Sequence, residues 1–415
     1  MISLLFALLA FISLAITVWQ WWVARRFPLH RRVADLGHAP AVTVLKPLKG
    51  CDTETHRCLE SWFVQDYSGE VQVLFGVASA DDPVCETVRQ LIASHPGRDA
   101  QLMICAESHG ANGKVSTLIQ LRRQAKHEFI VVSDADIQVP RDFVANVIAP
   151  LCEPPVGLVN CFYRLATPST LAMHWEAIAI NADFWSQVLQ ARSLKAIDFA
   201  LGAAMATTRT QLDSIGGFAA LVDYLADDYQ LGNLTAQRGG RIEISPVVVE
   251  CRESPKTWSQ VWAHQLRWAR TIRICRPVPY FLSILSNATL WPLLMLLAGT
   301  SGQWTKQIAS APGIANGSAS ETTVTIAIPS IFTLFLVCLL VRILTALSNR
   351  AHLEESGLQL ASAWLIPIKD LLNAAIWALA FLGNRIVWQG HTYRVTAGGK
   401  LVQITKQPPP LRPAA

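Results

Sequence analysis

Residues 129–136 read FIVVSDAD, so a run of four apolar residues is followed closely by two carboxylates, Asp134 and Asp136. A short apolar run rich in Ile and Val and bounded by polar residues is typical of a buried β-strand. The strand holds the carboxylates that follow it in fixed positions, and hard oxygen ligands suit Mg²⁺ or Mn²⁺ bridging a diphosphate. The stretch therefore predicts a nucleotide site with a divalent cation. Asp134 and Asp136 are the predicted metal ligands, and Asp134 is also predicted to contact the nucleotide.

Similar apolar runs alternate with helical segments between about residues 42 and 279. Strands are predicted at 42–45, 71–77, 102–105 and 129–132, and helices at 54–63, 83–94 and 114–126. This alternation predicts an α/β fold with a mostly parallel sheet, whose ligand site lies at the carboxyl ends of the strands. Later in the chain, strands are predicted at 160–163, 241–244 and 247–249, and helices at 177–191, 230–237 and 258–276.

A second acidic pair, Asp81 and Asp82, follows the predicted strand at 71–77 and precedes Pro83. At that edge of the sheet, these carboxylates are predicted to accept hydrogen bonds from a nucleotide base or ribose. Capping of the next helix is the alternative, because an acidic residue before a first-turn proline is a common helix start. Both roles can hold at once.

A third acidic pair, Asp227 and Asp228, lies in the sequence ADDY. Two neighbouring carboxylates raise the pKa of one of them, which suits a general base that works near neutral pH. Asp228 is the predicted base for an acceptor hydroxyl, and Asp227 is a candidate contact for the acceptor or the diphosphate. Helix capping is again the alternative.

An aromatic and basic stretch, HQLRW at 264–268, lies in the predicted helix at 258–276. Arg267 and Trp268 are predicted to hold the departing diphosphate and the acceptor, with His264 as a further candidate contact. A plain position on a helix face is the alternative. Lys114, which follows the flexible stretch GANG, is a candidate phosphate or uridine contact.

The composition places a good part of the chain in lipid. Of 415 residues, 51% are hydrophobic and only 16% are charged, whereas soluble domains carry about 25% charged residues. The net charge of +5 is modest, and no block of Lys and Arg favours a nucleic-acid partner. The nine cysteines occur singly, which argues against a zinc site and against a disulfide framework.

Residues 2–24 carry no charge and are long enough to span a bilayer. Arg25 and Arg26 follow this segment directly, which is the order of an uncleaved anchor and not of a signal peptide. By the positive-inside rule the chain after Arg25 lies in the cytosol. Further apolar zones occupy residues 281–300, 324–347 and 358–388.

The third of these zones is too long for one span and holds Lys369 and Asp370 at its middle. We interpret the pair as a break between an interfacial or re-entrant piece and a true span; a functional site is the alternative. The linker at 301–323 is predicted to be an external loop. The basic tail after the third zone is predicted to be cytosolic, and the number of crossings stays open.

Together these features predict a glycosyltransferase that moves a sugar from a nucleotide donor to a membrane lipid. Its expected parts are an anchor at 1–24, a cytosolic catalytic domain at 25–279 that ends in an interfacial helix, a membrane region at 280–388 and a cytosolic tail at 389–415. The expected partners are a UDP-sugar, a lipid acceptor and the bilayer itself. The expected location is the bacterial inner membrane.

The motifs resemble those of the ceramide glucosyltransferases, glycosyltransferase family 21, within the family-2-like GT-A group. The likeness rests on KPLKG at 46–50, DDP at 81–83, SDAD at 133–136, IGGF at 215–218, ADDY at 226–229, LRW at 266–268, WQGHTYR at 388–394 and the glycines at 398–399. This resemblance implies an inverting transfer from UDP-glucose to a lipid hydroxyl, with a divalent cation. It also implies that Asp134 and Asp136 serve nucleotide and metal, that Asp228 is the base, and that Arg267 and Trp268 belong to the family's Q/R-x-x-R-W box.

One residue departs from that box, because His264 stands where the family usually has Gln or Arg. The run HQLRWART at 264–271 and the stretch NCFYR at 160–164 resemble the bacterial hopanoid-biosynthesis-associated glycosyltransferases of the same family. Those are thought to pass N-acetylglucosamine to phosphatidylethanolamine, so the sugar and the acceptor stay open. A polysaccharide synthase and an inactive membrane scaffold are further alternatives. A polymer channel needs more spans than are seen here, and the intact acidic pairs argue against a scaffold.

Overall fold

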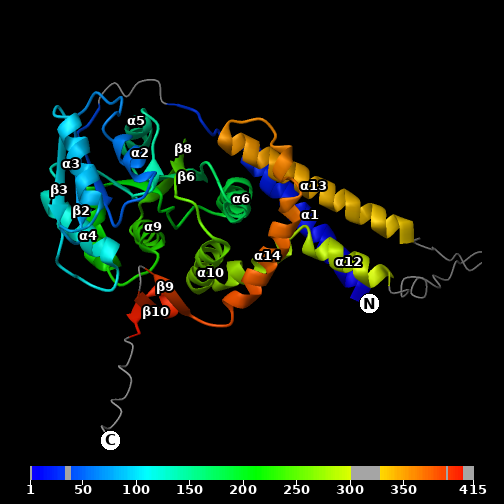
Figure 1. Ribbon diagram of the computed structural model, residues 1–415. Coiled ribbons are helices and arrows are strands. Elements are labelled where there is room, and N and C mark those ends of the chain that lie inside the picture. Colours follow the sequence, from blue (N-terminus) through cyan, green and yellow to red (C-terminus); the bar gives the residue numbers. More distant parts are fainter. Residues whose placement is uncertain (1, 33–38, 301–327, 389–390, 405–415) are drawn as a thin grey trace, which may run out of the picture. The chain divides into compact units, whose positions relative to one another are not determined.

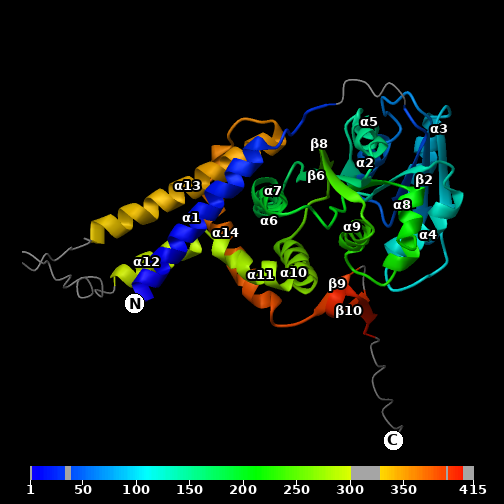
Figure 2. The ribbon, with the colours of Figure 1, turned by 180° about the vertical axis from the view of Figure 1, so that it is seen from behind.

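The computed structural model describes residues 2–32, 39–300, 328–388 and 391–404 (Figures 1 and 2). The chain divides into two compact units. One, which we call the apolar unit, comprises Met1–Phe27, Ile178–Gln190 and Val278–Ala378. The other, the sheet unit, comprises Pro28–Ala177, Ala191–Pro277 and Leu379–Ala415.

The sheet unit is built on one large sheet with the strand order β3-β2-β1-β4-β7-β6-β8-β5. Its strands are β1 (Val42–Pro47), β2 (Val71–Val77), β3 (Asp99–Ile104), β4 (Phe129–Ser133), β5 (Ile137–Gln138), β6 (Val156–Leu165), β7 (Ala204–Thr208) and β8 (Arg241–Cys251). Strands β1 to β4 are mutually parallel, and β7 runs antiparallel to both β4 and β6. The prediction of an α/β fold with a mostly parallel sheet is therefore confirmed.

The helices of the sheet unit show the apolar faces and capping residues that their own sequences favour. They are α2 (Thr55–Glu60), α3 (Val84–Ser94), α4 (Gly113–Gln124), α5 (Phe143–Ile148), α6 (Leu171–Ile178), α8 (Arg209–Ser214), α9 (Asp227–Gln237) and α10 (Trp258–Cys275). Helix α3 buries Val84, Val88 and Leu91, which share one face at helical spacing. Helix α10 begins with a capping box in which Thr257 and Gln260 bond each other's backbone N–H groups. Helices α3 and α4 lie beside strands β2 and β3 (Figure 1).

The largest differences from the sequence prediction within the predicted elements of this region occur at two places. The strands predicted at 241–244 and 247–249 form one strand, β8, because β6 pairs with it along its whole length, with a register shift between Cys161 and Phe162. The helix predicted at 177–191 is α6, a π-helical segment η2 (Ala179–Phe184) and α7 (Trp185–Leu194). The pairing of β8 with β6 and the π-helical segment η2 cannot be recognised from the periodicity of hydrophobic residues in the sequence.

The end of the chain adds a second sheet to the sheet unit. It is formed by β9 (Arg385–Trp388), β10 (His391–Val395) and β11 (Leu401–Gln403). The sequence places these residues at the end of a membrane zone and in a tail, but the sheet packs on the domain. The Leu401 N–H donates to the Asp223 carbonyl at 2.7 Å, and the Leu225 N–H donates to the Gly399 carbonyl at 3.1 Å.

The apolar unit contains the helices that suit a membrane. They are α1 (Ile2–Arg26), α11 (Pro277–Leu282), α12 (Leu290–Thr300), α13 (Ile328–Glu354) and α14 (Leu365–Ala380). Within the described residues, α1 and α13 are long and apolar enough to cross a membrane. The apolar zone at 281–300 is part of a pair of helical pieces bent by 54°, which is a broken span or a re-entrant loop. The predicted linker at 301–323 lies outside the described residues.

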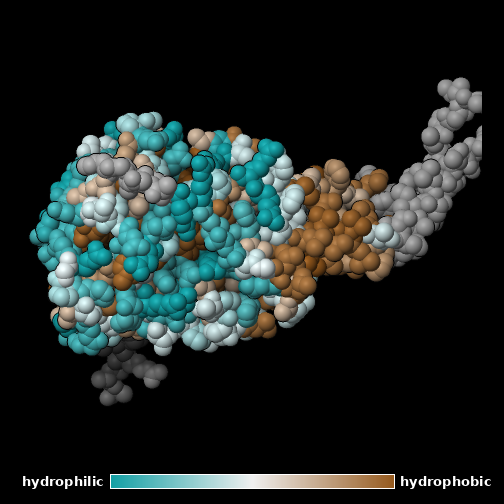
Figure 3. All heavy atoms as spheres, turned by 90° about the horizontal axis from the view of Figure 1, so that it is seen from above, coloured by the Kyte–Doolittle hydropathy of each residue, from teal (hydrophilic) through white to brown (hydrophobic). Residues whose placement is uncertain are grey.

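Hydrophobic residues dominate the surface of the apolar unit that Figure 3 shows, whereas the sheet unit is mostly hydrophilic on the same view. An apolar exterior on long helices is stable in lipid but not in water. These helices indicate an integral membrane protein.

Charged residues are nevertheless buried inside the apolar unit. Helix α14 runs without interruption through Lys369 and Asp370, so the predicted break at this pair is wrong. The Arg342 guanidinium donates to Asp370 and, at 2.9–3.0 Å, to Asp183 of η2, and Lys369 also pairs with Asp183. The Thr289 hydroxyl donates to Asp370 at 2.7 Å. Each buried charge has a partner of opposite sign, which is the condition for burying it.

Candidate active site

Three segments distant in sequence meet at Lys114. Asp134 directly follows β4, Lys114 is the second residue of α4, and Asp227 begins α9. The Lys114 Nζ lies 2.6 Å from Asp134 Oδ1 and 3.2 Å from Asp227 Oδ2. Burial opposes the charge of Lys114, but Asp134 and Asp227 together raise its pKa well above the usual value. The structure therefore joins the second and third acidic clusters through one cation.

Lys114 is held in place by the residues before α4. The Asn112 side chain caps the helix by accepting a hydrogen bond from the Val115 N–H at 3.1 Å, and its amide donates to the Tyr224 carbonyl at 2.8 Å. Asn112 is fully buried, so these bonds are shielded from water. The GANG stretch is thus tied to the segment that precedes Asp227.

Asp227 and Asp228 both lie in the first turn of α9, which begins earlier than the helix predicted at 230–237. Acidic residues are favoured in that turn by the helix dipole. Burial, and next the Asp227 charge, raise the pKa of Asp228 to about 6, although Lys114 opposes the shift. A Cβ at Gly202 would lie 2.8 Å from Asp228 Oδ2, so glycine leaves room for that carboxylate. The raised pKa suits the predicted general base.

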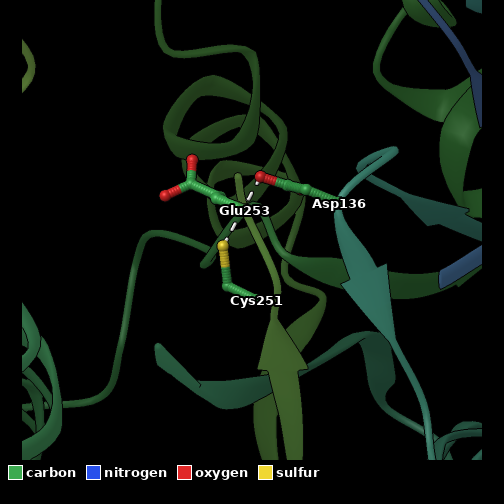
Figure 4. A group of neighbouring side chains, drawn as sticks. All are labelled: Asp136, Cys251 and Glu253. Atoms are coloured by element: carbon green, nitrogen blue, oxygen red, sulfur yellow. Dashed lines mark hydrogen bonds between the residues drawn. The ribbon is translucent and has the colours of Figure 1, made fainter. Parts of the chain in front are cut away.

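Asp136 joins a different group, with Cys251 at the end of β8 and Glu253 just after it (Figure 4). One ligand atom from each residue lies within 4.8 Å of the others. Burial, and next the charges of Asp134 and Glu253, raise the pKa of Asp136 to about 6. Lys256 Nζ lies 2.5 Å from Glu253 Oε1, so the group already attracts positive charge.

The chemistry of this donor set fits a hard divalent cation. Two carboxylates provide oxygen ligands. Burial, and next Asp136, raise the pKa of the Cys251 thiol well above its usual value, so the sulfur stays protonated and points its hydrogen at Asp136, 3.5 Å away. Asp136 and Glu253 are therefore the candidate ligands here. Asp134, the other predicted ligand, has its carboxylate on Lys114.

The sequence reasoning missed Glu253 and also Lys46 of β1. The Lys46 side chain is fully buried and donates to the Ser133 hydroxyl at 3.3 Å and to the Asp134 carbonyl. Burial lowers the pKa of Lys46 to about 8. A lysine inside an apolar strand could have been recognised from the sequence as a candidate site residue. No pattern in the sequence around Glu253 distinguishes it in this way.

Asp81 and Asp82 occupy the loop between β2 and α3. The Asp82 carboxylate accepts from the Gly50 N–H at 3.0 Å and from the Val84 N–H at 3.1 Å. Asp82 therefore links two loops at the carboxyl edge of the sheet and contacts the start of α3. Asp81 is exposed, and its backbone N–H donates to the Ser79 hydroxyl.

Helix α10 brings His264 to a buried acid that the sequence did not single out, Glu176 of α6. His264 Nδ1 lies 2.7 Å from Glu176 Oε1, and the Gln265 amide donates to the same oxygen at 2.9 Å. Burial alone would raise the pKa of Glu176, but the hydrogen bond with His264 brings it below the usual value. The Trp268 ring lies edge-on to the His264 ring, with centroids 4.6 Å apart.

Arg267 lies one turn along the same helix and is largely buried, and burial lowers its pKa, opposed by the charges of Glu253 and Glu176. Its guanidinium makes no hydrogen bond to any described residue. A buried cation without such a partner is suited to receive an anion.

Two tryptophans of α10, the helix predicted to lie at the membrane interface, pack within the sheet unit. Trp258 and Trp262 of α10 stack near the buried Trp175, with ring centroids 5.7 and 6.2 Å from it. Trp258 keeps 43% of its surface exposed. The interfacial role of this helix stays a prediction.

The second sheet supports the start of α9. Tyr224 pairs with Lys400 as an antiparallel bridge, and the Gln230 amide donates to the Gly398 carbonyl at 3.0 Å. The Tyr393 ring belongs to an apolar cluster that also packs on Ala111 and Leu225. These contacts hold both segments that flank the Lys114–Asp227 ion pair.

Comparison with known proteins agrees with this architecture. Residues 4–316 and 305–401 match the model of the family described as Glycosyl transferase family 21. Ceramide glucosyltransferase 3 of Caenorhabditis elegans is 23% identical over 91% of this chain and 77% of that protein, and Ceramide glucosyltransferase 1 of the same organism is 25% identical over 53% and 47%.

Among solved structures, a mannosyltransferase from Pyrobaculum calidifontis in complex with GDP-Man and Mn²⁺ has a TM-score of 0.50 at 21% identity. The match covers 92% of this chain and 98% of that one, and it supports a GT-A-like fold. The family match spans nearly the whole length, including the second sheet. The chain therefore belongs to glycosyltransferase family 21 and is a glycosyltransferase distantly related to the ceramide glucosyltransferases.

Proposed function

We propose that this protein is an inverting hexosyltransferase that moves a sugar from a UDP-sugar to the hydroxyl of a membrane lipid. The observation that carries the proposal is the Lys114 bridge, which joins Asp134, the proposed nucleotide contact, to Asp227, the neighbour of the proposed base Asp228. Family membership and the apolar helices add support.

In this proposal the acceptor hydroxyl loses its proton to Asp228 as its oxygen attacks the anomeric carbon of the sugar. The bond from that carbon to the diphosphate breaks in the same step, and UDP leaves with the bonding electrons. A single displacement needs one base and no protein nucleophile, which agrees with inversion. The pKa of Asp228, about 6, leaves it ionised at neutral pH.

Negative charge grows on the leaving diphosphate, so positive groups around it accelerate the reaction. Arg267 and Lys114 are the proposed protein groups, and Trp268 and His264 are proposed to line the acceptor side. Asp136 and Glu253 would hold a divalent cation, which supplies charge against the diphosphate. Asp82 and Asp81 are proposed to face the nucleoside.

The proposed reaction is UDP-glucose to ceramide, as the names of the relatives suggest. The second candidate, N-acetylglucosamine to phosphatidylethanolamine, is favoured by His264 in the box. The donor is too polar to cross lipid, so the sheet unit is proposed to lie in the cytosol of a bacterial cell, with its acceptor taken from the facing leaflet.

The test is to express the protein in membranes, supply labelled UDP-glucose or UDP-N-acetylglucosamine with ceramide or phosphatidylethanolamine, and identify the glycolipid by mass spectrometry. One sugar–lipid pair should give product. Asp228→Asn should bind UDP normally and lower turnover about a hundredfold or more. UDP binding without transfer to any lipid would contradict the proposal, and near-normal turnover of Asp228→Asn would contradict the assigned base.

A further inference from the structure

Four arginines gather where the second sheet meets α10. Arg270 and Arg273 lie on α10, Arg385 on β9 and Arg394 on β10. Three of them line a pocket of about 540 Å³ together with Leu382, Gly383 and Asn384. Strands β9 and β10 lie close to the C-terminal half of α10 in both ribbon views (Figures 1 and 2).

Among the residues that the structure describes, no carboxylate forms an ion pair with these four arginines. The sequence has no Asp or Glu between residues 257 and 276 or after Asp370, so both segments that build the pocket lack acids. The Arg270 guanidinium donates to the Arg385 carbonyl at 2.5 Å, and Arg273 donates to the Asn384 side chain. Neutral oxygens therefore orient the guanidinium groups without cancelling their charge. Burial, and next the Arg273 charge, lower the pKa of Arg270.

The pairing of β9 with β10 places Arg385 directly opposite Arg394. Like charges at directly opposed positions destabilise an antiparallel pair. A bound anion removes this repulsion, and a phosphate group accepts the bidentate hydrogen bonds that arginine donates. The two opposed arginines therefore destabilise the empty pocket, and a bound anion stabilises it.

The rim of the pocket is apolar and exposed. Leu382, which lines the pocket, is 78% exposed, and Val387, two residues along β9 from Arg385, is 71% exposed. The segment follows directly on α14, a helix of the apolar unit, by chain continuity. A free phosphate ion has no apolar part that could contact these exposed side chains, whereas a phospholipid has a phosphate group beside its acyl chains.

We infer that the arginine pocket binds the headgroup of an anionic phospholipid. The residues that line the pocket are not among the proposed donor and acceptor contacts, and the inference does not depend on which sugar or lipid is used in the reaction. Its occupation would fix the second sheet, and through it the segment before Asp227, to an anionic membrane surface.

The test measures lipid binding by native mass spectrometry on the full-length protein in detergent, with phosphatidylglycerol or phosphatidylcholine added. The wild type should retain phosphatidylglycerol in preference. Arg385→Gln/Arg394→Gln should lower that preference roughly tenfold or more, because each arginine near an anionic lipid surface contributes roughly fivefold in affinity and the variant removes two. Arg57→Gln/Arg238→Gln, which removes two exposed arginines elsewhere in the sheet unit, is the matched control and should bind like the wild type.

Thermal unfolding without lipid checks that the pocket variant folds, and it should be at least as stable as the wild type because the opposed charges are gone. An unchanged lipid preference in the folded pocket variant would overturn the inference. Displacement of the lipid by an equal concentration of inorganic phosphate or UDP would overturn it too, because the pocket would then be a site for soluble phosphates.

Discussion

The Lys114 ammonium and the Asp134 carboxylate lie 2.6 Å apart, although one begins a helix and the other follows a strand. Lys114 also contacts Asp227, so one side chain neutralises two acidic segments. Three carboxylates, including Asp228, would otherwise repel one another at this edge of the sheet. Lys114 is therefore the residue that allows the acidic clusters to form one site.

Replacing Lys114 by Met should weaken both the site and the fold. We expect a loss of about 2 kcal/mol in the free energy of unfolding, because charged hydrogen bonds in a mostly buried place are removed. UDP binding by calorimetry should weaken tenfold or more. Lys126→Met removes the surface ion pair with Asp99, also 2.6 Å long, and should cost less than about 1 kcal/mol. Equal effects of the two changes would show that Lys114 is only a surface charge.

The pH dependence of the rate should report Asp228. A base works when deprotonated, so kcat/KM should rise with pH up to about 6 and level off above it. Asp227→Asn removes a like charge and should move this acid limb to lower pH, although burial keeps part of the shift. The measurement is a pH profile of both proteins at saturating cation. A limb that moves to higher pH in Asp227→Asn would rule out repulsion by Asp227.

Metal affinity should depend on Glu253 more than on Cys251. Glu253→Gln removes a charged oxygen ligand, and we expect Mn²⁺ binding, measured by electron paramagnetic resonance without substrate, to weaken about tenfold or more. Cys251→Ser should change it little, because the buried thiol stays protonated. A larger effect of Cys251→Ser than of Glu253→Gln would show that the Cys251 sulfur is a metal ligand and would contradict the proposed oxygen ligands. Chelation of the cation should abolish transfer in the wild type.

Gly399 should be sensitive to a single methyl group. Its φ is +90°, and a Cβ there would lie 3.2 Å from the Cys275 Sγ. Gly399→Ala should cost about 1–2 kcal/mol of stability and lower kcat, since the Gly399 carbonyl holds the Leu225 N–H near Asp227. Gly97→Ala, where a Cβ meets nothing within 4 Å, should be neutral in thermal unfolding and in rate. A normal kcat in Gly399→Ala would separate the second sheet from catalysis.

The buried charges of the apolar unit should show strong coupling. Arg342→Met leaves Asp183 and Asp370 with only Lys369 and should cost about 3–5 kcal/mol. Arg342→Met/Asp370→Asn restores the charge balance and should be more stable than Arg342→Met alone. Thermal unfolding in detergent of the two single variants and the double variant gives the coupling energy. Additive losses would mean that the ion pairs contribute little.

Local sequence was sufficient for most of the α/β framework. The strand at 71–77 was predicted with its observed bounds, and α4 begins one residue before the predicted helix. Both rest on features that act within a few residues, namely apolar runs and helix caps. The first two acidic pairs were placed at strand ends for the same reason, and the resemblance to the family followed from the three pairs together with the other motifs.

The assembly of the site was decided by tertiary structure. Glu253 meets Asp136 only because β8 pairs with β5, and Glu176 meets His264 only because α6 packs on α10. The sequence places the second sheet in a tail because its few short strands have no strong hydrophobic period of their own. They are stabilised by contacts with distant residues such as Asp223 and Leu225. The sequence predicts a helix break at Lys369 and Asp370 because their partners, Arg342 and Asp183, lie far away in the chain. Periodicity and capping record interactions over a few residues. The partner of a charge or the neighbour of a strand depends on topology and register, which only the folded chain specifies.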